Sequence, residues 1–416
     1  MLRAFGKLWL KGAKRLAKAQ VAQQKKLQKT LVKSLSPAAK KSRPASTRCI
    51  APRPKPVPPP ARNRAAGAPS ASTEANARSR AAASRAHGSA GSTRLDDGGS
   101  WTRAYHVSPR ADSRGQHRRM LYWLFVPSAA VATSTVAGIA GLASVVGDGT
   151  PRAQLPLVVM LHGCEQTAEE FASGTRMNRL AAQQGFAVLY PQQSASAHPQ
   201  RCWPWYKRAV QQGGDEVALV AGMLERVLDR HDFDRRRTYV AGLSAGAALA
   251  QALAIRHPQM FAAVGSHSGP VFGVADSRLG AFTVMQAGAR DAVRTADALR
   301  HEQPDFPIMP ILILHGEQDQ VVRPVNASQL ARQFRILNRL APSAHEPPVS
   351  RKARSPNDAW RRTDSRQQGK VVVRLCEVAN LAHAWSGGDA SLRFNTARGP
   401  DASALMWDFF KRQRRR

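Results

Sequence analysis

The stretch Tyr239-Val-Ala-Gly-Leu-Ser-Ala-Gly246 constrains the fold of this chain more than any other part of the sequence. Residues 238–240 are β-branched or aromatic, as strands favour, and the residues after Gly246 are rich in alanine and leucine, as helices favour. A Gly-x-Ser-x-Gly motif at such a strand-to-helix turn presents its serine on a strained bend, and its glycines let strand and helix come close. The pattern predicts that Ser244 is a nucleophile; the alternative is that Ser244 only caps the helix.

Strands and helices alternate along the chain on either side of this motif. The continuous apolar run 155–161 is typical of a buried central strand, and residues 215–230 combine helical periodicity with two acids in the first turn. The same criteria predict further strands at 119–126, 186–190, 238–240, 262–265, 311–315 and 371–378, and further helices at 167–184, 245–255 and 403–412. This alternation predicts an α/β fold with a mainly parallel central sheet flanked by helices.

A serine becomes a strong nucleophile when a histidine takes its proton and a carboxylate orients that histidine. In an α/β-hydrolase the three residues follow in the order serine, acid, histidine. Asp319 comes soon after the predicted strand 311–315, and open α/β sheets carry their sites at the carboxyl ends of strands. Glu317 is the alternative acid, but Val321 and Val322 would anchor the loop that holds Asp319.

The predicted base is His383, which lies on a loop that is rich in glycine and follows the strand 371–378. Such a loop can place an imidazole over the serine. The chain has 12 histidines, so position alone leaves other choices open. His267, in Gly265-Ser-His-Ser-Gly269, is the main competitor.

Two backbone N–H groups are expected to hold the oxyanion that forms during acyl transfer. The first is that of Ala245, directly after the nucleophile, and the second is that of Cys164, in the loop after strand 155–161. Cys202 flanks the same predicted mouth. Cys164 and Cys202 therefore form either a disulfide or a pair of free thiols.

The positive charge of the chain is concentrated near its N-terminus. The chain carries 62 Lys and Arg against 28 Asp and Glu, a formal net charge of +34, yet residues 1–95 contain Glu74 as their one acid. We expect a basic amphipathic helix at 1–35, a disordered Pro/Ala/Arg-rich linker at 36–100 and a catalytic domain at 101–412, with insertions near 129–153 and 342–370. The helix would either bind an anionic or apolar surface, such as a membrane or a polymer granule, or remain solvated. No motif supports a nucleic-acid partner, and no Cys/His spacing suggests a metal.

Several motifs taken together resemble the esterase family of extracellular short-chain-length poly(3-hydroxybutyrate) depolymerases, with feruloyl and acetylxylan esterases as similar relatives. They are Leu161-His-Gly-Cys-Glu-Gln166, Arg201-Cys-Trp-Pro-Trp205, Tyr239-Val-Ala-Gly-Leu-Ser-Ala-Gly246, Val264-Gly-Ser-His-Ser-Gly269, His383-Ala-Trp-Ser-Gly-Gly388 and Gly399-Pro-Asp-Ala-Ser403. The resemblance implies an α/β-hydrolase fold, a triad of Ser244, Asp319 and His383, and no cofactor. Ala247 and Ala382 stand where the family usually has glycine, and a Cβ at each is expected to narrow the pocket.

The residues and the resemblance together predict a carboxylic-ester hydrolase that acts on poly(3-hydroxybutyrate), its oligomers or related short-chain esters. The alternatives are an esterase of feruloyl or acetylxylan type and a surface-binding protein with an idle hydrolase domain. Trp203, Trp205 and Trp385 are candidates to line an apolar substrate surface, with core packing as the alternative. The resemblance implies an extracellular location, although the N-terminus shows no clear secretory signal; a cytoplasmic or granule-associated location is the alternative.

Overall fold

The computed structural model of the chain describes residues 92–95, 97–111, 115–128, 143–145, 151–273, 275–341, 344, 346–351 and 359–415. The basic helix expected at 1–35 lies outside these residues. So do most of the linker expected at 36–100 and most of the insertion expected near 129–153. These three expectations therefore stay predictions.

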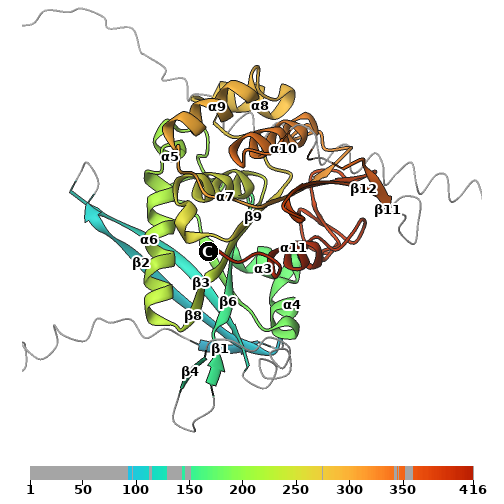
Figure 1. Cartoon of the computed structure of the whole chain (residues 1–416). Helices are drawn as coiled ribbons and strands as arrows, with labels where there is room; N and C mark the ends of the chain where they lie inside the picture. The colour runs from blue at the N-terminus through green and yellow to red at the C-terminus, as the bar shows by residue number, and fades with distance from the viewer. Residues whose placement is uncertain are drawn as a thin grey trace, which may run out of the picture. The chain divides into compact units, whose positions relative to one another are not determined.

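An eleven-stranded sheet forms the centre of the described part of the chain (Figure 1). Six neighbouring strands in its middle are parallel, in the order β7, β6, β8, β9, β10 and β13, and antiparallel strands extend both edges. Across the sheet the strands are β1 (Ser92–Leu95), β2 (Gly99–Ala111), β3 (His117–Pro127), β7 (Ala187–Gln192), β6 (Leu155–Leu161), β8 (Phe233–Leu243), β9 (Ala263–His267), β10 (Ile311–Gly316), β13 (Lys370–Val378), β12 (Trp360–Gln367) and β11 (Val349–Arg351). Two small sheets pair β4 (Ala143–Val145) with β5 (Pro151–Ala153) and β14 (Trp385–Ser386) with β15 (Asn395–Thr396).

Helices pack on both faces of the sheet because the central strands are apolar on both faces. In β6, Leu157 and Val159 belong to one apolar core, and Val158 and Met160 belong to the other, as the alternation of side chains along a strand requires. Helices α5 (Arg208–Gln211), α6 (Asp215–Arg230), α7 (Ala245–Arg256), α8 (Arg278–Ala287), α9 (Ala292–Glu302) and α10 (Val325–Leu337) contribute to the first core. Helices α3 (Ala168–Thr175), α4 (Met177–Gln184) and α11 (Ala402–Phe410) contribute to the second.

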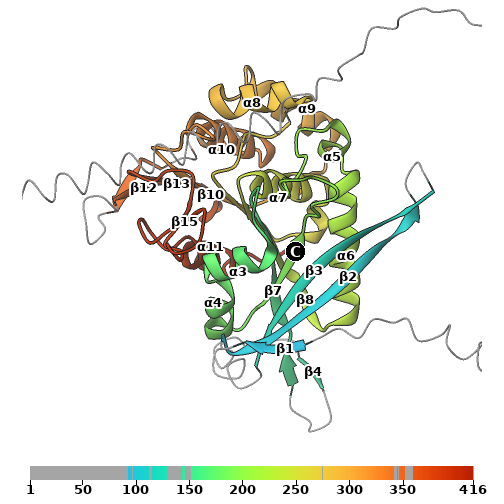
Figure 2. The same cartoon turned by 180° about the vertical axis from the view of Figure 1, so that it is seen from behind.

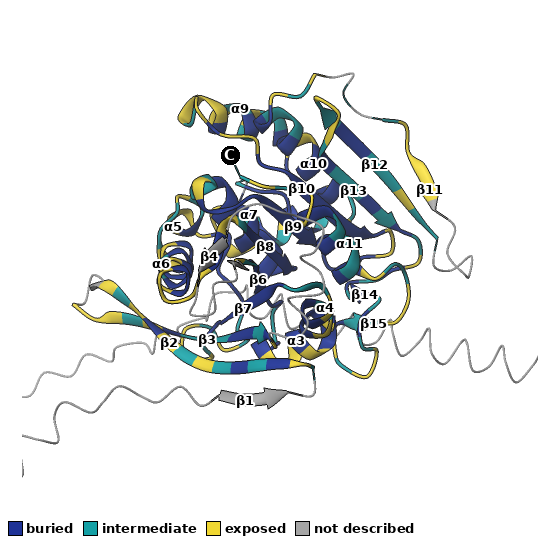
Figure 3. Ribbon diagram, turned by 60° about the horizontal axis from the view of Figure 1, so that its bottom comes forward, coloured by how far each residue is buried: buried dark blue, intermediate teal, exposed yellow. Residues whose placement is uncertain are grey.

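The figures show the same division into layers. In Figures 1 and 2, α3, α4 and α11 lie together, apart from α8, α9 and α10. Figure 3 shows the central strands as mostly buried. A short 3₁₀ helix (Pro258–Met260) follows α7. None of the helices within the described ranges has the length and apolarity needed to cross a bilayer.

Two expectations about secondary structure are wrong. The helix predicted at 167–184 is broken at Arg176, whose φ of 56° is left-handed, so that α3 ends and α4 begins there. Residues 342–370 were expected to be an irregular insertion, yet β11 and β12 lie within this range. The polar sequence of β12 conceals a strand, because buried Asp364 is paired with Arg374 across β12 and β13 at 2.8 Å. An ion pair between side chains of β12 and β13 thus stabilises their pairing, and a search for apolar residues at alternate positions does not find it.

Candidate active site

The predicted nucleophile lies where β8 turns into α7. Ser244 has φ 57° and ψ −118°, a strained conformation for a residue with a side chain. The two glycines of the motif permit this turn. A Cβ on Gly242 would overlap with the backbone of Gly246, and a Cβ on Gly246 would overlap with the carbonyl oxygen of Leu161 in β6. Ser244 therefore stands at the carboxyl end of a central strand, directly before the N-terminus of a buried helix.

The predicted acid and base contact each other at the same edge of the sheet. Asp319 follows β10 and is fully buried, and its Oδ2 accepts a hydrogen bond of 2.8 Å from Nδ1 of His383, which follows β13. Its Oδ1 accepts hydrogen bonds of 2.9 Å from the backbone N–H groups of Val321 and Val322. The two valines thus anchor the loop, as the sequence suggested.

The electrostatics of this pair favour an ionised carboxylate. Burial alone would raise the pKa of Asp319, but the charge of His383, its hydrogen bond, His315 and the Val322 N–H outweigh burial and lower that pKa below its ordinary value. A carboxylate that keeps its charge can hold an imidazole in one tautomer, with its proton on Nδ1. The other ring nitrogen of His383 is then the one that can accept a proton.

Neither of the two alternatives takes part in the contact between Asp319 and His383. Glu317 is exposed and forms an ion pair with Arg361 at 3.8 Å. His267 is fully buried, and its ring stacks against Trp385 with a centroid separation of 4.9 Å. Burial, and after it the charges of His315 and His383, hold the pKa of His267 well below its ordinary value. His267 is therefore a neutral, packed residue in this structure.

His315 is a residue near the candidate acid that sequence reasoning missed. It is buried, its Nε2 lies 3.6 Å from Oδ2 of Asp319, and Nε2 forms a hydrogen bond of 2.8 Å with the carbonyl oxygen of Val322. The hydrogen bond shows that the Nε2–H donates to the loop rather than to the carboxylate. Its position four residues before Asp319, at the end of β10, was the available signal.

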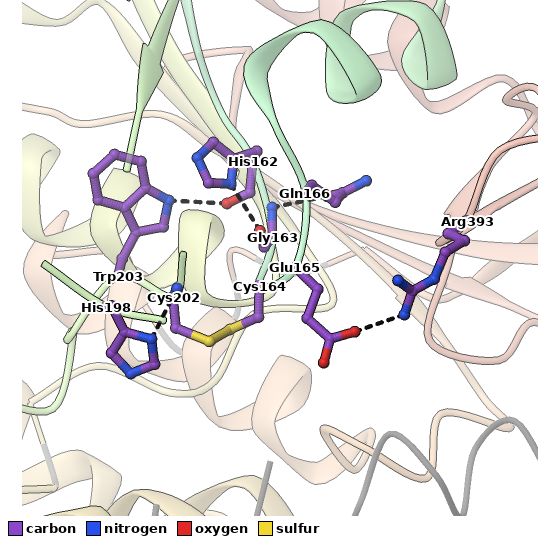
Figure 4. The surroundings of a disulfide bond; sticks show 9 residues. All are labelled: His162, Gly163, Cys164, Glu165, Gln166, His198, Cys202, Trp203 and Arg393. Carbon is purple, nitrogen blue, oxygen red and sulfur yellow. Dashed lines mark hydrogen bonds and ion pairs between the residues drawn. A yellow bond between two sulfur atoms is a disulfide. The ribbon is translucent and has the colours of Figure 1, made fainter. Parts of the chain in front are cut away.

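The loop that follows β6 lies beside the serine turn and is braced from several sides (Figure 4). A disulfide joins Cys164 to Cys202 with a Cα–Cα distance of 4.3 Å. The indole N–H of Trp203 donates to the carbonyl oxygen of His162 at 2.9 Å, and the backbone N–H of Gly163 donates to Oε1 of Gln166 at the same distance. A Cβ on Gly163 would lie 3.5 Å from the carbonyl oxygen of Leu243. These contacts hold Cys164 close to the turn that carries Ala245.

The three tryptophans proposed as substrate contacts lie in the interior. Trp203 and Trp385 are fully buried, and Trp205 is 8% exposed. Trp203 holds the loop after β6, and Trp385 packs between His267 and Phe171. This burial does not fit a substrate surface for Trp203 or Trp385; it fits the alternative of core packing.

The strand order, with a serine turn after β8, an acid after β10 and a histidine after β13, defines an α/β-hydrolase fold. The solved structure of an acetyl xylan esterase from Aspergillus awamori shares this fold, with a TM-score of 0.53 and 18% identity over 74% of this chain and 99% of that chain. A family model described as Esterase PHB depolymerase matches residues 141–350, just over half of the chain. The chain therefore belongs to the Esterase PHB depolymerase family.

The proteins to which the chain is similar include a depolymerase and a feruloyl esterase. The chain is 34% identical to poly(3-hydroxyalkanoate) depolymerase C of Paucimonas lemoignei over 45% of this chain and 46% of that protein. It is 32% identical to feruloyl esterase B of Thermothelomyces thermophilus over 43% of this chain and 64% of that protein. The chain thus covers less than two thirds of the length of either relative.

The lowered pKa of Asp319 predicts how the stability of the chain depends on pH. A carboxyl group whose pKa in the folded state lies below its ordinary value of 3.8 stabilises the fold above that value, and the contribution is lost as the pH falls through the folded pKa. We expect urea unfolding between pH 3 and 7 to show that Asp319→Asn lowers the free energy of unfolding most at pH 7 and progressively less below about pH 4. Glu317→Gln, at the exposed neighbour, is the control. An equal loss of stability for Asp319→Asn at every pH would contradict this assignment.

Proposed function

We propose that this chain is a carboxylic-ester hydrolase in which Ser244, His383 and Asp319 form the catalytic triad. The observation that carries the proposal is the buried 2.8 Å contact between Asp319 and His383, at the strand ends that also carry the strained turn of Ser244. Packed histidines and buried acids are common separately. Their pairing beside a Gly-x-Ser-x-Gly turn is what acyl transfer by serine needs.

In the proposed reaction, Oγ of Ser244 attacks the ester carbonyl while Nε2 of His383 takes the hydroxyl proton. Asp319 keeps the other ring nitrogen protonated and stabilises the imidazolium. The backbone N–H groups of Ala245 and Cys164 would hold the oxyanion, and the N-terminus of α7 adds a favourable dipole. His383 then gives its proton to the leaving alcohol. Water, deprotonated by the same imidazole, releases the acid and restores the serine.

The proposed substrates are poly(3-hydroxybutyrate), its oligomers and related short-chain esters. Membership of the Esterase PHB depolymerase family and the likeness to a poly(3-hydroxyalkanoate) depolymerase support this class. The likeness to a feruloyl esterase favours a second candidate, the hydrolysis of feruloyl or acetyl esters of plant polysaccharides. A binding protein with an idle hydrolase domain is a poorer fit, because the acid–base pair is intact. The basic segment 1–35 remains a proposed anchor to an anionic or apolar surface.

Replacing the nucleophile tests the reaction itself. We expect Ser244→Ala to lower kcat for p-nitrophenyl butyrate by about 10⁶-fold, because a triad acts as a unit. A Ser328→Ala variant, which removes an exposed hydroxyl bonded to the carbonyl oxygen of Val325 within α10, serves as the control. Near-normal turnover by Ser244→Ala would refute the proposal.

A substrate panel separates the two classes of ester. We expect the purified chain to release acid from hydroxybutyrate oligomers and amorphous poly(3-hydroxybutyrate) at least about 10-fold faster than it hydrolyses methyl ferulate, a difference of about 1.4 kcal/mol in transition-state binding. Product formation is measured by titration and chromatography under matched conditions. A preference for methyl ferulate or acetylated xylan would contradict the first candidate and support the second, the hydrolysis of feruloyl or acetyl esters of plant polysaccharides.

We also propose that the chain works in an oxidising, extracellular environment. The Cys164–Cys202 disulfide supports this location, because disulfides persist outside the reducing cytosol. We expect mass spectrometry of the protein from its native source, alkylated at the moment of collection, to find Cys164 and Cys202 bonded to each other. Two alkylated thiols would contradict the proposed location.

A further inference from the structure

We propose that His267 is a positioning residue that sets the spacing between the turn of Ser244 and the loop of His383. The inference rests on the triad proposed above, and it concerns a residue that takes no part in proton transfer. His267 ends β9, the strand between the one that carries the serine and the one that carries the acid. From this place it contacts both the turn of Ser244 and the segment that follows His383.

The backbone of His267 holds the serine turn. Leu243 and His267 are partners in the parallel pairing of β8 and β9. One residue further, the N–H of Ser244 donates a hydrogen bond of 2.9 Å to the carbonyl oxygen of His267. The strained conformation of Ser244 is thus tied directly to the end of β9.

The side chain of His267 holds the histidine loop. Its Nε2 accepts a hydrogen bond of 3.3 Å from the backbone N–H of Ser386, and its ring stacks on Trp385. These residues follow His383 by three and two positions, and all of the partners are buried. One imidazole therefore connects β9 to the segment that carries the proposed base.

The hydrogen bonding of the ring identifies its tautomer. Because Nε2 accepts from Ser386, the proton lies on Nδ1, which is 3.1 Å from Oγ of Ser268 and donates to it. Protonation of Nε2 would remove the acceptor and place a cation near His315 and His383. Burial disfavours that state first, and the two neighbouring histidines add to the effect. The link therefore persists while His383 changes its own protonation during turnover.

Loss of this link should affect the chemical step more than binding. Without an acceptor, the buried N–H of Ser386 is left unsatisfied, which favours a shift of its loop toward another partner. A shift of the loop would change the distance from His383 to Ser244. A displacement of about 1 Å in such a pair can lower the rate about 10²-fold.

Two variants that carry the same amide group at different distances from the backbone test whether the position of the acceptor matters. In His267→Gln the amide oxygen reaches the place of Nε2 and can accept from Ser386, whereas in His267→Asn the amide reaches only the place of Nδ1. We expect kcat for p-nitrophenyl butyrate to fall about 10²-fold in the asparagine variant and less than 10-fold in the glutamine variant, with KM within about 3-fold of wild type in both. His267→Phe keeps an aromatic stack without an acceptor and should resemble the asparagine variant.

A second readout separates positioning from simple loss of stability. A fluorophosphonate should label Ser244 more slowly in His267→Asn but still reach full stoichiometry, with circular dichroism confirming a folded chain. The matched control is His106→Phe, because His106 is also buried but lies on β2 against Gly222 of α6. We expect the control to keep a kcat close to that of the wild type.

The outcomes distinguish this inference from the proposed function. Equal kcat values for the glutamine and asparagine variants, or a wild-type kcat for His267→Phe, would overturn the role of His267 while leaving the triad intact. An inactive wild type, or an active Ser244→Ala variant, would instead overturn the proposed function. If His267→Phe does not fold, the glutamine and asparagine variants decide the question.

Discussion

The close approach of α7 to β6 is the constraint on which the rest of the site depends. A Cβ on Gly246 would overlap with the carbonyl oxygen of Leu161, so the helix begins almost in contact with the neighbouring strand. The chain can reach that position only through the strained backbone of Ser244. Because α7 is apolar and buried along nearly its whole length, packing on the sheet compensates for that strain.

The interior of the site also holds a charge. Asp319 is fully buried, and its carboxylate accepts from two backbone N–H groups and one imidazole N–H, with no arginine or lysine among these partners in the part of the chain that the structure describes. The N–H groups stabilise the carboxylate as dipoles, and the charge of His383 adds to their effect. Burial also lowers the pKa of nearby His267 and His315, so neither competes with His383 as a cation beside the carboxylate.

The sequence predicts those parts of the fold in which local pattern and tertiary environment agree. The strand 155–161 and the helix 215–230 were located at their observed bounds, because each has an unbroken apolar or amphipathic pattern. The break at Arg176 and the strand β12 escaped prediction, because a left-handed residue and a cross-strand ion pair leave little trace in local composition. In the site, the sequence motifs predicted Ser244, Asp319 and His383 as nucleophile, acid and base, in that order along the chain. The contacts of His267 with Ser244 and Ser386 were not predicted, because they depend on which strands become neighbours in the sheet.

The burial of Trp203 and Trp385 favours core packing, the alternative to a substrate surface that the sequence left open. Trp203 lies one residue after Cys202, and both reach the loop after β6, one through a hydrogen bond to His162 and the other through a disulfide to Cys164 (Figure 4). The aromatic segment therefore braces the loop whose Cys164 N–H is proposed to bind the oxyanion. Preorganised N–H groups are worth most when they need no rearrangement during the reaction. A covalent bond and an indole hydrogen bond on adjacent residues supply that rigidity, and this accounts for an aromatic segment that is buried.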